Sequence, residues 1–449
     1  MKPFAQTMKD TLMGIIDEMA ANPRPFVRNP DTDFIRDRKI SFRDTINFIL
    51  SMGGSTLNQE LLDYFLFNSL GTPTASAFVQ QRAKVLPDAF RHIFRRFTHA
   101  TQPPRPTDGF RLIAVDGTGT AFYCDPSDRE NHIDNSSLKG YNAMHITALY
   151  DLHTRSYADA AIQGGKGDEF RAFCDMVDRY PAHLAPRTIF IADRGFASYN
   201  VFAHIMQKGA YFLIRTKDTT SNGIASRLGL PTSGGFDRTV HITLVRRQTN
   251  YFKNLPGARL VQKQVPFDFL GYGSDGTYPM TLRFVRLMLP DGTYELLVTN
   301  LPADTFPPAG LLRLYGMRWG VESSFRELKY SIGLSNYHCR KPQSVMQEIW
   351  ARLTLYNFCE AIIARTAEEM AGEMAEEAAG GRGKKKYIYQ INFTLAIHVC
   401  ICFLRTLPHE APPNVGALIR KHLLPVRPGR QFRRRARPRY VVSFLYRIS

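Results

Sequence analysis

Four polar residues near the middle of the chain have a spacing that could support chemistry: Tyr315, Arg318, Glu322 and Lys329. The sequence around them predicts one helix, and at about 100° per residue the four side chains fall within a stripe roughly 60° wide. Apolar residues occupy the neighbouring face. An ordinary surface helix with i,i+4 charge pairs is the simplest interpretation. In either case, the Glu322 carboxylate is held between two cations.

Two aspartates follow apolar runs that predict buried strands. Residues 111–115 lead into Asp116, and residues 188–192 lead into Asp193. Because Asp and Gly favour turns, each segment alone is equally well explained as a strand that ends in an ordinary turn. Together with Glu322, however, the two aspartates could bring three carboxylates to one site.

Three carboxylates suit the cleavage and transfer of phosphodiesters. Two divalent ions about 3.5 to 4 Å apart can stabilise both the attacking and the leaving oxygen. Hard oxygen ligands favour Mg²⁺ or Mn²⁺. The six cysteines are scattered and lack the spacing of a zinc site, so we expect reduced, cytosolic thiols.

The spacing from Tyr315 to Lys329 resembles the signature of the type-four insertion-sequence transposases, a bacterial family of DDE enzymes. The resemblance implies that Asp116, Asp193 and Glu322 are the catalytic triad and hold two Mg²⁺ or Mn²⁺ ions. It further implies that Arg318 and Lys329 grip DNA phosphates beside the scissile bond, with Tyr315 packed there. The run that starts at Asp193, Asp-Arg-Gly-Phe, also resembles the second-Asp motif of the family.

The charge of the chain favours a nucleic-acid partner. The 58 Lys and Arg exceed the 40 Asp and Glu, which gives 58 − 40 = +18 and a pI near 9.7. Residues 427–439 contain seven arginines and no acid, among them Arg433, Arg434 and Arg435. We expect this tail to contact DNA, although a solvated end of the chain would have the same composition. No apolar run is long enough for a membrane helix, and the first residues lack the apolar core of a signal peptide.

The order of predicted elements indicates an α/β protein. Residues 1–105 are predicted to form a helical N-terminal domain, with one helix over 75–97. The resemblance implies that this is a DNA-binding domain that recognises transposon ends, although a plain helical support domain would show the same pattern. Residues 106–216 and 303–366 are predicted to form a ribonuclease-H-like catalytic domain, with a helix at 169–178. The other two parts are a β-rich insertion domain at 217–302 and a helical C-terminal region at 367–449 with the basic tail. Residues 368–386, acidic up to residue 377 and rich in Gly and Lys after it, are predicted to form a mobile loop.

The β-rich insertion contains further candidates for DNA contacts. Arg246, Arg247, Tyr251, Phe252 and Lys253 could bind phosphates and bases. An ordinary hairpin that exposes the same residues is an equally good interpretation for any one of them.

Other functions fit less well. A haloacid-dehalogenase-type phosphatase would need a nucleophilic Asp where Ala114 stands, and an actin-like ATPase would need a Gly-rich adenosine segment that we do not find. A metal-dependent nuclease with the same triad stays open, whereas a non-catalytic DNA-binding relic is disfavoured because all three carboxylates are present. We therefore predict a bacterial, cytoplasmic cut-and-paste transposase. Its partners would be double-stranded transposon ends and target DNA, bound by a homodimer in the synaptic complex, without a membrane.

Overall fold

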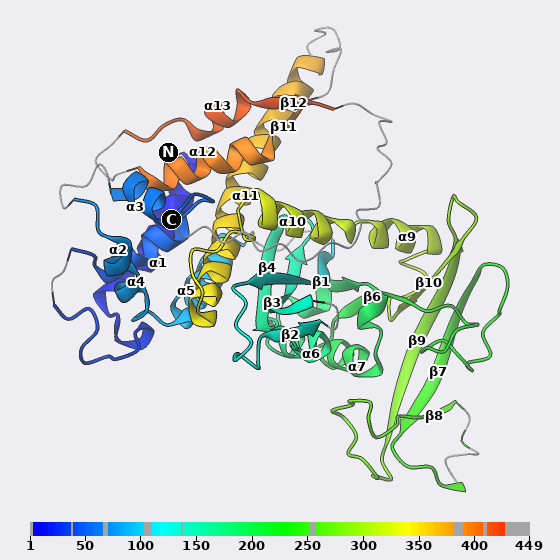
Figure 1. Cartoon of the computed structure of the whole chain (residues 1–449). Helices are drawn as coiled ribbons and strands as arrows, with labels where there is room; N and C mark the ends of the chain where they lie inside the picture. Colours follow the sequence, from blue (N-terminus) through cyan, green and yellow to red (C-terminus); the bar gives the residue numbers. More distant parts are fainter. Residues whose placement is uncertain are drawn as a thin grey trace.

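The computed structural model describes residues 3–426, except for 37–38, 66–70, 103–108, 136–137, 251–254, 256, 380–388 and 407–410. A large mixed β-sheet occupies the centre of the molecule (Figure 1). Helices from the two ends of the chain gather on one side of the picture, and long strands extend on the other.

The N-terminal part is helical, as the sequence predicts. Its helices are α1 (Phe4–Ala21), α2 (Phe42–Ser51), α3 (Leu57–Phe65), α4 (Ala75–Arg82) and α5 (Pro87–Thr101). The single helix predicted over 75–97 is wrong, because α4 ends at Arg82 and α5 begins at Pro87. Proline suits the first turn of a helix, where its missing N–H is not needed, and its ring restricts the residue before it.

The sheet contains strands from two predicted parts of the chain, residues 106–216 and 217–302. Its order is β2-β3-β1-β5-β6-β10-β9-β7-β8, and β4 pairs with β3. The strands are β1 (Arg111–Phe122), β2 (His132–Asn135), β3 (Leu138–Asp151), β4 (Ser156–Gly164), β5 (Thr188–Ala192), β6 (Tyr211–Thr216), β7 (Phe236–Val245), β8 (Ala258–Leu260), β9 (Thr277–Met288) and β10 (Tyr294–Thr299). Because β10 pairs with β6, the sheet runs without a break from residues 106–216 into the predicted insertion. The domain boundaries remain predictions.

Strand β1 differs from its prediction. It does not end in a turn at Asp116 but continues to Phe122, and Asp116 lies opposite Ala148 of β3. The long antiparallel partner keeps the Asp-Gly step extended, so tertiary pairing overrides the local turn preference. Gly117 leaves room for two side chains there, because a Cβ atom would lie 2.7 Å from both Glu169 Oε1 and His145 Nε2.

Helices cover both faces of the sheet. On one face, Ile113 and Val115 of β1 pack into an apolar core with residues of α6 (Glu169–Asp178) and α7 (Tyr199–Gln207). On the other face, Ala114 belongs to a core shared with α10 (Trp319–Tyr330), α11 (Pro342–Ala379) and the N-terminal helices. This alternation is the two-residue period of a strand buried on both sides. Figure 1 shows α6 and α7 below the strands and α9 and α10 above them.

The single helix predicted around Glu322 is two helices. Helix α9 (Pro308–Gly316) ends just after Tyr315, and α10 begins at Trp319. Between them, backbone bonds such as Arg318 N to Tyr315 O span three residues instead of four. Gly320 allows a close approach, since a Cβ atom there would lie 2.8 Å from Leu152 Cδ2 in the turn between β3 and β4.

The C-terminal region is mostly helical in its described part. It contains the end of α11, then β11 (Tyr389–Ile391), α12 (Phe393–Arg405), α13 (Val415–Arg420) and β12 (Leu423–Pro425). The mobile loop predicted at 368–386 is wrong up to Ala379, because α11 continues to that residue. Residues 380–386 lie outside the described part of the chain. Ala, Glu and Met are strong helix formers, and Arg420 of α13 forms ion pairs with Glu369 and Glu373. No helix in the described part of the chain is long and apolar enough to cross a membrane.

Candidate active site

Three neighbouring parallel strands place three charged residues side by side. Val115 of β1 pairs with Ala192 of β5, and Ala192 pairs with Ile214 of β6. The next residues along these strands are Asp116, Asp193 and Arg215. Because parallel strands run in the same direction, these three residues lie side by side just beyond the last paired residues, toward the carboxyl ends of the strands. The predicted position of Asp193 directly after a buried strand is confirmed.

Glu322 comes to this edge on α10. Arg318 Nη2 donates to Glu322 Oε1 at 2.7 Å, and Arg318 Nη1 lies 3.8 Å from Asp116 Oδ2. The Arg318 side chain is only 6% exposed, whereas those of Asp116 and Glu322 are 25% and 35% exposed. The guanidinium therefore links two of the three carboxylates from below the surface.

The carboxyl group of Asp116 is a weaker acid than that of an ordinary aspartate. Burial raises its pKa to about 6, against the hydrogen bond from the Gly117 N–H and the charge of Arg318. The nearby negative charges of Glu322 and Asp193 raise the pKa further. The cations of the protein therefore compensate only part of the negative charge at this edge.

Asp193 has the opposite shift. Burial alone would raise its pKa, but hydrogen bonds from the Arg194 backbone and the Tyr315 hydroxyl lower it, as do the charges of Arg318 and Arg215. The Tyr315 hydroxyl donates to Oδ1 at 3.1 Å, and Arg215 Nη1 lies 3.8 Å from the same oxygen. Tyr315 thus contacts the site from the end of α9, although the predicted continuous helix is broken.

Lys329 is half-buried near the β3 side of the site. Burial lowers the pKa of its ammonium. Burial lowers the pKa of the His145 imidazole on β3, and the negative charge of Glu169 opposes this shift. Lys329 lies close enough to His145 for its positive charge to lower this pKa further. His145 Nε2 is 2.7 Å from Glu169 Oε1, next to Gly117.

The donor atoms fit a hard divalent ion in type. No group of three or more His, Cys, Asp and Glu side chains lies close enough to hold one metal ion, within the residues that the structure describes. Mg²⁺, however, is commonly bound by one or two carboxylates together with water and phosphate oxygens of the substrate. Carboxylates at 116, 193 and 322 can supply ligands of that kind if Arg318 gives up its contacts with two of them.

The residues predicted to bind DNA in the insertion have different surroundings. The Arg246 side chain is buried and donates to five backbone carbonyls, those of Val261, Gln262, Val265, Phe267 and Leu270. It fixes the loop after β8, which argues against the predicted phosphate contact. Arg247 is 56% exposed and forms an ion pair with Asp275. Tyr251, Phe252, Lys253 and the tail residues Arg433, Arg434 and Arg435 lie outside the described residues.

Sequence reasoning missed two charged residues at the site. Arg215 follows the apolar run 210–214 just as Asp193 follows its own, so the same strand-end pattern could have identified it. Glu295 of β10 lies beside it, with Oε1 3.3 Å from Arg215 Nε and only 10% of the side chain exposed. Only the pairing of β6 with β10 shows that Glu295 belongs here.

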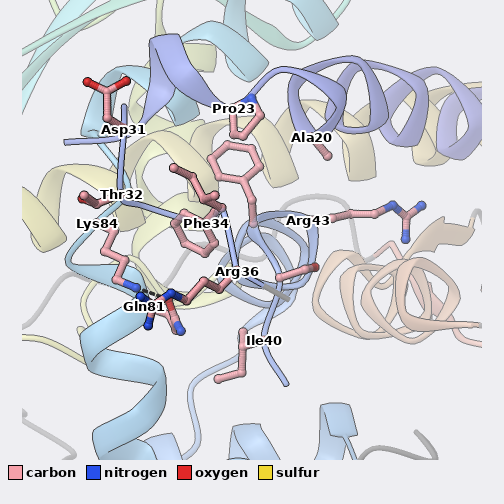
Figure 2. Close-up of a pocket in the computed structure, with 13 residues that line it drawn as sticks. Ala20, Pro23, Asp31, Thr32, Phe34, Arg36, Ile40, Arg43, Gln81 and Lys84 are labelled. Carbon is pink, nitrogen blue, oxygen red and sulfur yellow. Dashed lines mark hydrogen bonds between the residues drawn. The ribbon is translucent and has the colours of Figure 1, made fainter. Parts of the chain in front are cut away.

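A pocket in the N-terminal helices is separate from this site. Figure 2 shows it between α1, α2 and α4, with Phe34, Arg36, Arg43 and Lys84 among its lining residues. The Lys84 ammonium lies over the Phe34 ring and donates to Gln81. None of the three carboxylates lines this pocket. This pocket is therefore not the place where the three carboxylates meet.

Comparisons with known proteins agree with the predicted family. Transposase InsG for insertion sequence element IS4, from Escherichia coli (strain K12), is 22% identical over 374 residues, which are 80% of this chain and 74% of that protein. A cryo-EM structure of the piggyBac transposase synaptic complex with hairpin DNA aligns with a TM-score of 0.45 and 10% identity, over 93% of this chain and 81% of that chain. The family model described as "Transposase DDE domain" matches residues 108–358. Because this match covers more than half of the chain, the protein belongs to the DDE transposases, a family of metal-dependent enzymes of DNA transposition.

Proposed function

We propose that this chain is a cut-and-paste transposase that binds the inverted-repeat ends of an insertion sequence, cleaves them and joins their 3′-hydroxyls to target DNA. One observation carries the proposal. In a member of the DDE family, Asp116 and Asp193 occupy adjoining positions on paired strands, and Arg318 connects Asp116 to Glu322. We assign these three carboxylates as the catalytic triad.

The triad would hold two Mg²⁺ or Mn²⁺ ions. When bound, such ions supply the Lewis-acid stabilisation of the attacking and leaving oxygens that phosphoryl transfer needs. Asp116 is held within β1, Asp193 directly follows β5, and Glu322 is held on a helix whose apolar face is buried. Rigid elements of this kind keep ligands in place more accurately than loops do.

Arg318 would have two successive roles. In the protein alone, it neutralises Asp116 and Glu322. Once divalent ions take over that function, the guanidinium can turn one edge toward a phosphate, for which its planar fork is well suited. Tyr315 keeps Asp193 oriented through its hydroxyl.

Lys329 would bind a phosphate of the transposon end. Its ammonium has no ion-pair partner among the described residues, and it is half-buried two helical turns from Glu322. A cation held in this way is available to an incoming phosphate. Arg247, Lys253 and the arginines of the tail would add contacts farther from the scissile bond.

We further infer that residues 106–216 and 303–366 form a ribonuclease-H-like unit. The antiparallel β3-β1 pair followed by parallel β5 and β6, with helices on both faces, supports this. The N-terminal helices would recognise the transposon ends, and the strands from 217–302 would hold the DNA. Double-stranded DNA is the partner, bound by a homodimer that pairs the two ends.

A joining assay tests this function against the nuclease alternative. The protein would be incubated with pre-cleaved ends that carry the inverted repeats flanking its gene, a supercoiled plasmid and Mg²⁺. Recombinant plasmid with the end covalently joined is the expected product. Protein that binds the ends and only degrades DNA would be a nuclease, and protein that binds without reaction would be the non-catalytic relic.

A further inference from the structure

Two cations flank the three carboxylates along the sheet. Lys329 lies toward β3, close to His145, and Arg215 lies toward β10, beside Glu295. The proposed function uses only the first. Resting on that function, we propose that Arg215 binds a phosphate of the DNA that continues beyond the scissile bond, and that Glu295 positions it.

The Arg215 side chain is both anchored and accessible. Its Nε lies 3.3 Å from Glu295 Oε1, whose side chain is 10% exposed, whereas Arg215 itself is 42% exposed. Glu295 is therefore a buried support for a guanidinium at the rim of the site. Anchoring through Nε leaves the two terminal nitrogens on the other edge of the fork, where a phosphate can be bound by two parallel hydrogen bonds.

The terminal nitrogens of Arg215 make only a weak contact with Asp193, their present partner. Arg215 Nη1 lies 3.8 Å from Asp193 Oδ1, which is beyond hydrogen-bonding distance, and the shorter contact of that oxygen is with the Tyr315 hydroxyl. If Asp193 binds a divalent ion in the reacting complex, that ion compensates the negative charge of the carboxylate. The charge of Arg215 is then free for a phosphate, while its contact with Glu295 is kept.

The order of the strands determines which DNA segment this phosphate belongs to. Lys329 is on the β3 side of Asp116, and Arg215 is on the β6 side of Asp193. In an in-line transfer, the scissile phosphate lies over the carboxylates, so the strand leaves the site in two directions. With the transposon end at Lys329, Arg215 meets the other side. This is flanking DNA during cleavage and target DNA during joining.

Two duplexes test the assignment. An end duplex stops at the transposon terminus, and a flanked duplex carries the same repeat and continues into neighbouring DNA. Dissociation constants would be measured in Ca²⁺, which also takes oxygen ligands, with gels to check that the DNA stays intact. Arg215→Ala should weaken binding of the flanked duplex about tenfold and of the end duplex less than about twofold, as expected when one charge-assisted hydrogen bond is removed.

Conservative variants separate positioning from charge. Compared with Arg215→Ala, Arg215→Lys should recover part of the affinity for the flanked duplex, because it keeps the positive charge but not the planar, two-pronged guanidinium. Glu295→Gln should lower the affinity for the flanked duplex alone, by less than Arg215→Ala does. These two variants carry the test if Arg215→Ala does not fold. The matched control is Arg365→Ala, which removes an exposed arginine paired with Glu369 on α11 and should leave both duplexes unaffected.

The outcomes distinguish this inference from the function on which it rests. If Arg215→Ala weakens both duplexes equally or neither, Arg215 does not contact flanking DNA and the inference is wrong, while joining by the wild-type protein would still support a transposase. If the wild-type protein binds neither duplex, the proposed function and the inference fail together. Joining of pre-cleaved ends to a plasmid should also be reduced in Arg215→Ala, since target DNA occupies the same side.

Discussion

The guanidinium of Arg318 is 2.7 Å from a carboxylate oxygen of Glu322, one helical turn away, and is almost completely buried. The same guanidinium faces Asp116. A buried cation between two carboxylates keeps their mutual repulsion low before any divalent ion arrives. These contacts hold the carboxylates in place in the protein without ions, and Arg318 would have to give them up for the same oxygens to bind a divalent ion.

Replacement of Arg318 by Met should reveal this compensation. The Asp116 and Glu322 carboxylates would then face each other with no cation between them, and the free energy of unfolding without divalent ions should fall by roughly 2 kcal/mol. Mg²⁺ should restore more stability to the variant than to the wild type, because binding to the folded state alone is stabilising. Thermal melts with and without Mg²⁺ measure this. Equal Mg²⁺-induced shifts in both proteins would contradict it.

If the three carboxylates form the catalytic triad, substitution of one of the aspartates should abolish DNA cleavage and leave the fold intact. Asp116→Asn or Asp193→Asn removes a ligand charge with little change in volume, and cleavage of end duplexes in Mg²⁺ should fall by at least about 100-fold. Circular dichroism should remain that of the wild type. The matched control is Asp134→Asn, whose side chain is 92% exposed. Activity of either triad variant within about tenfold of the wild type would disprove the assignment.

Lys329 and Glu322 should affect different steps. Lys329→Ala should weaken capture of the cleaved end by about 1.5 to 3 kcal/mol, which corresponds to one charge-assisted hydrogen bond. Glu322→Gln should still bind paired ends but fail to nick them. Gel-shift titrations and nicking assays on the same duplexes separate the two effects. The matched control is Lys208→Ala, which removes a partly buried lysine that caps the end of α7 and donates to the Asp178 carbonyl; it should behave as the wild type in both assays.

A buried carboxylate on α11 should make the stability of the protein depend on pH. Burial raises the pKa of Glu360 from its ordinary 4.5 to about 8, although Arg155 Nε lies 2.6 Å away and opposes the shift. Since the folded state retains the proton more tightly than the unfolded state, the free energy of unfolding should decrease as pH rises from 4.5 to about 8, by a few kcal/mol. Glu360→Gln should flatten this dependence in urea titrations at pH 5 and 8. A wild-type curve that rises over this window would contradict the pKa shift.

The basic tail should contribute to DNA binding regardless of the DNA sequence. Deletion of residues 427–449 should weaken binding to all duplexes alike and reduce the log–log salt dependence by about 0.9 for each phosphate that the tail neutralises. Affinities measured between low and moderate salt, for the inverted repeat and for a scrambled duplex, test this. An unchanged slope would mean that the tail does not touch the DNA backbone.

The sequence by itself determined the family and much of the local structure. The spacing from Tyr315 to Lys329 predicted the family, which the match over residues 108–358 confirms. The helix at 169–178 and the strand before Asp193 were also predicted correctly. These features depend on residues close together in the chain, where side-chain periodicity and strand-end patterns are informative.

Only the tertiary structure decided how these residues meet. Asp116 lies within a strand instead of a turn because β3, remote in sequence, pairs along it. Arg246 is buried because a loop after β8 folds over it, and Arg215 reaches Asp193 and Glu295 because β6 lies between β5 and β10. Pairing register and loop packing are set by contacts between distant segments, whose free energies of burial and hydrogen bonding outweigh local preferences. The local sequence around each of these residues does not reveal such long-range contacts.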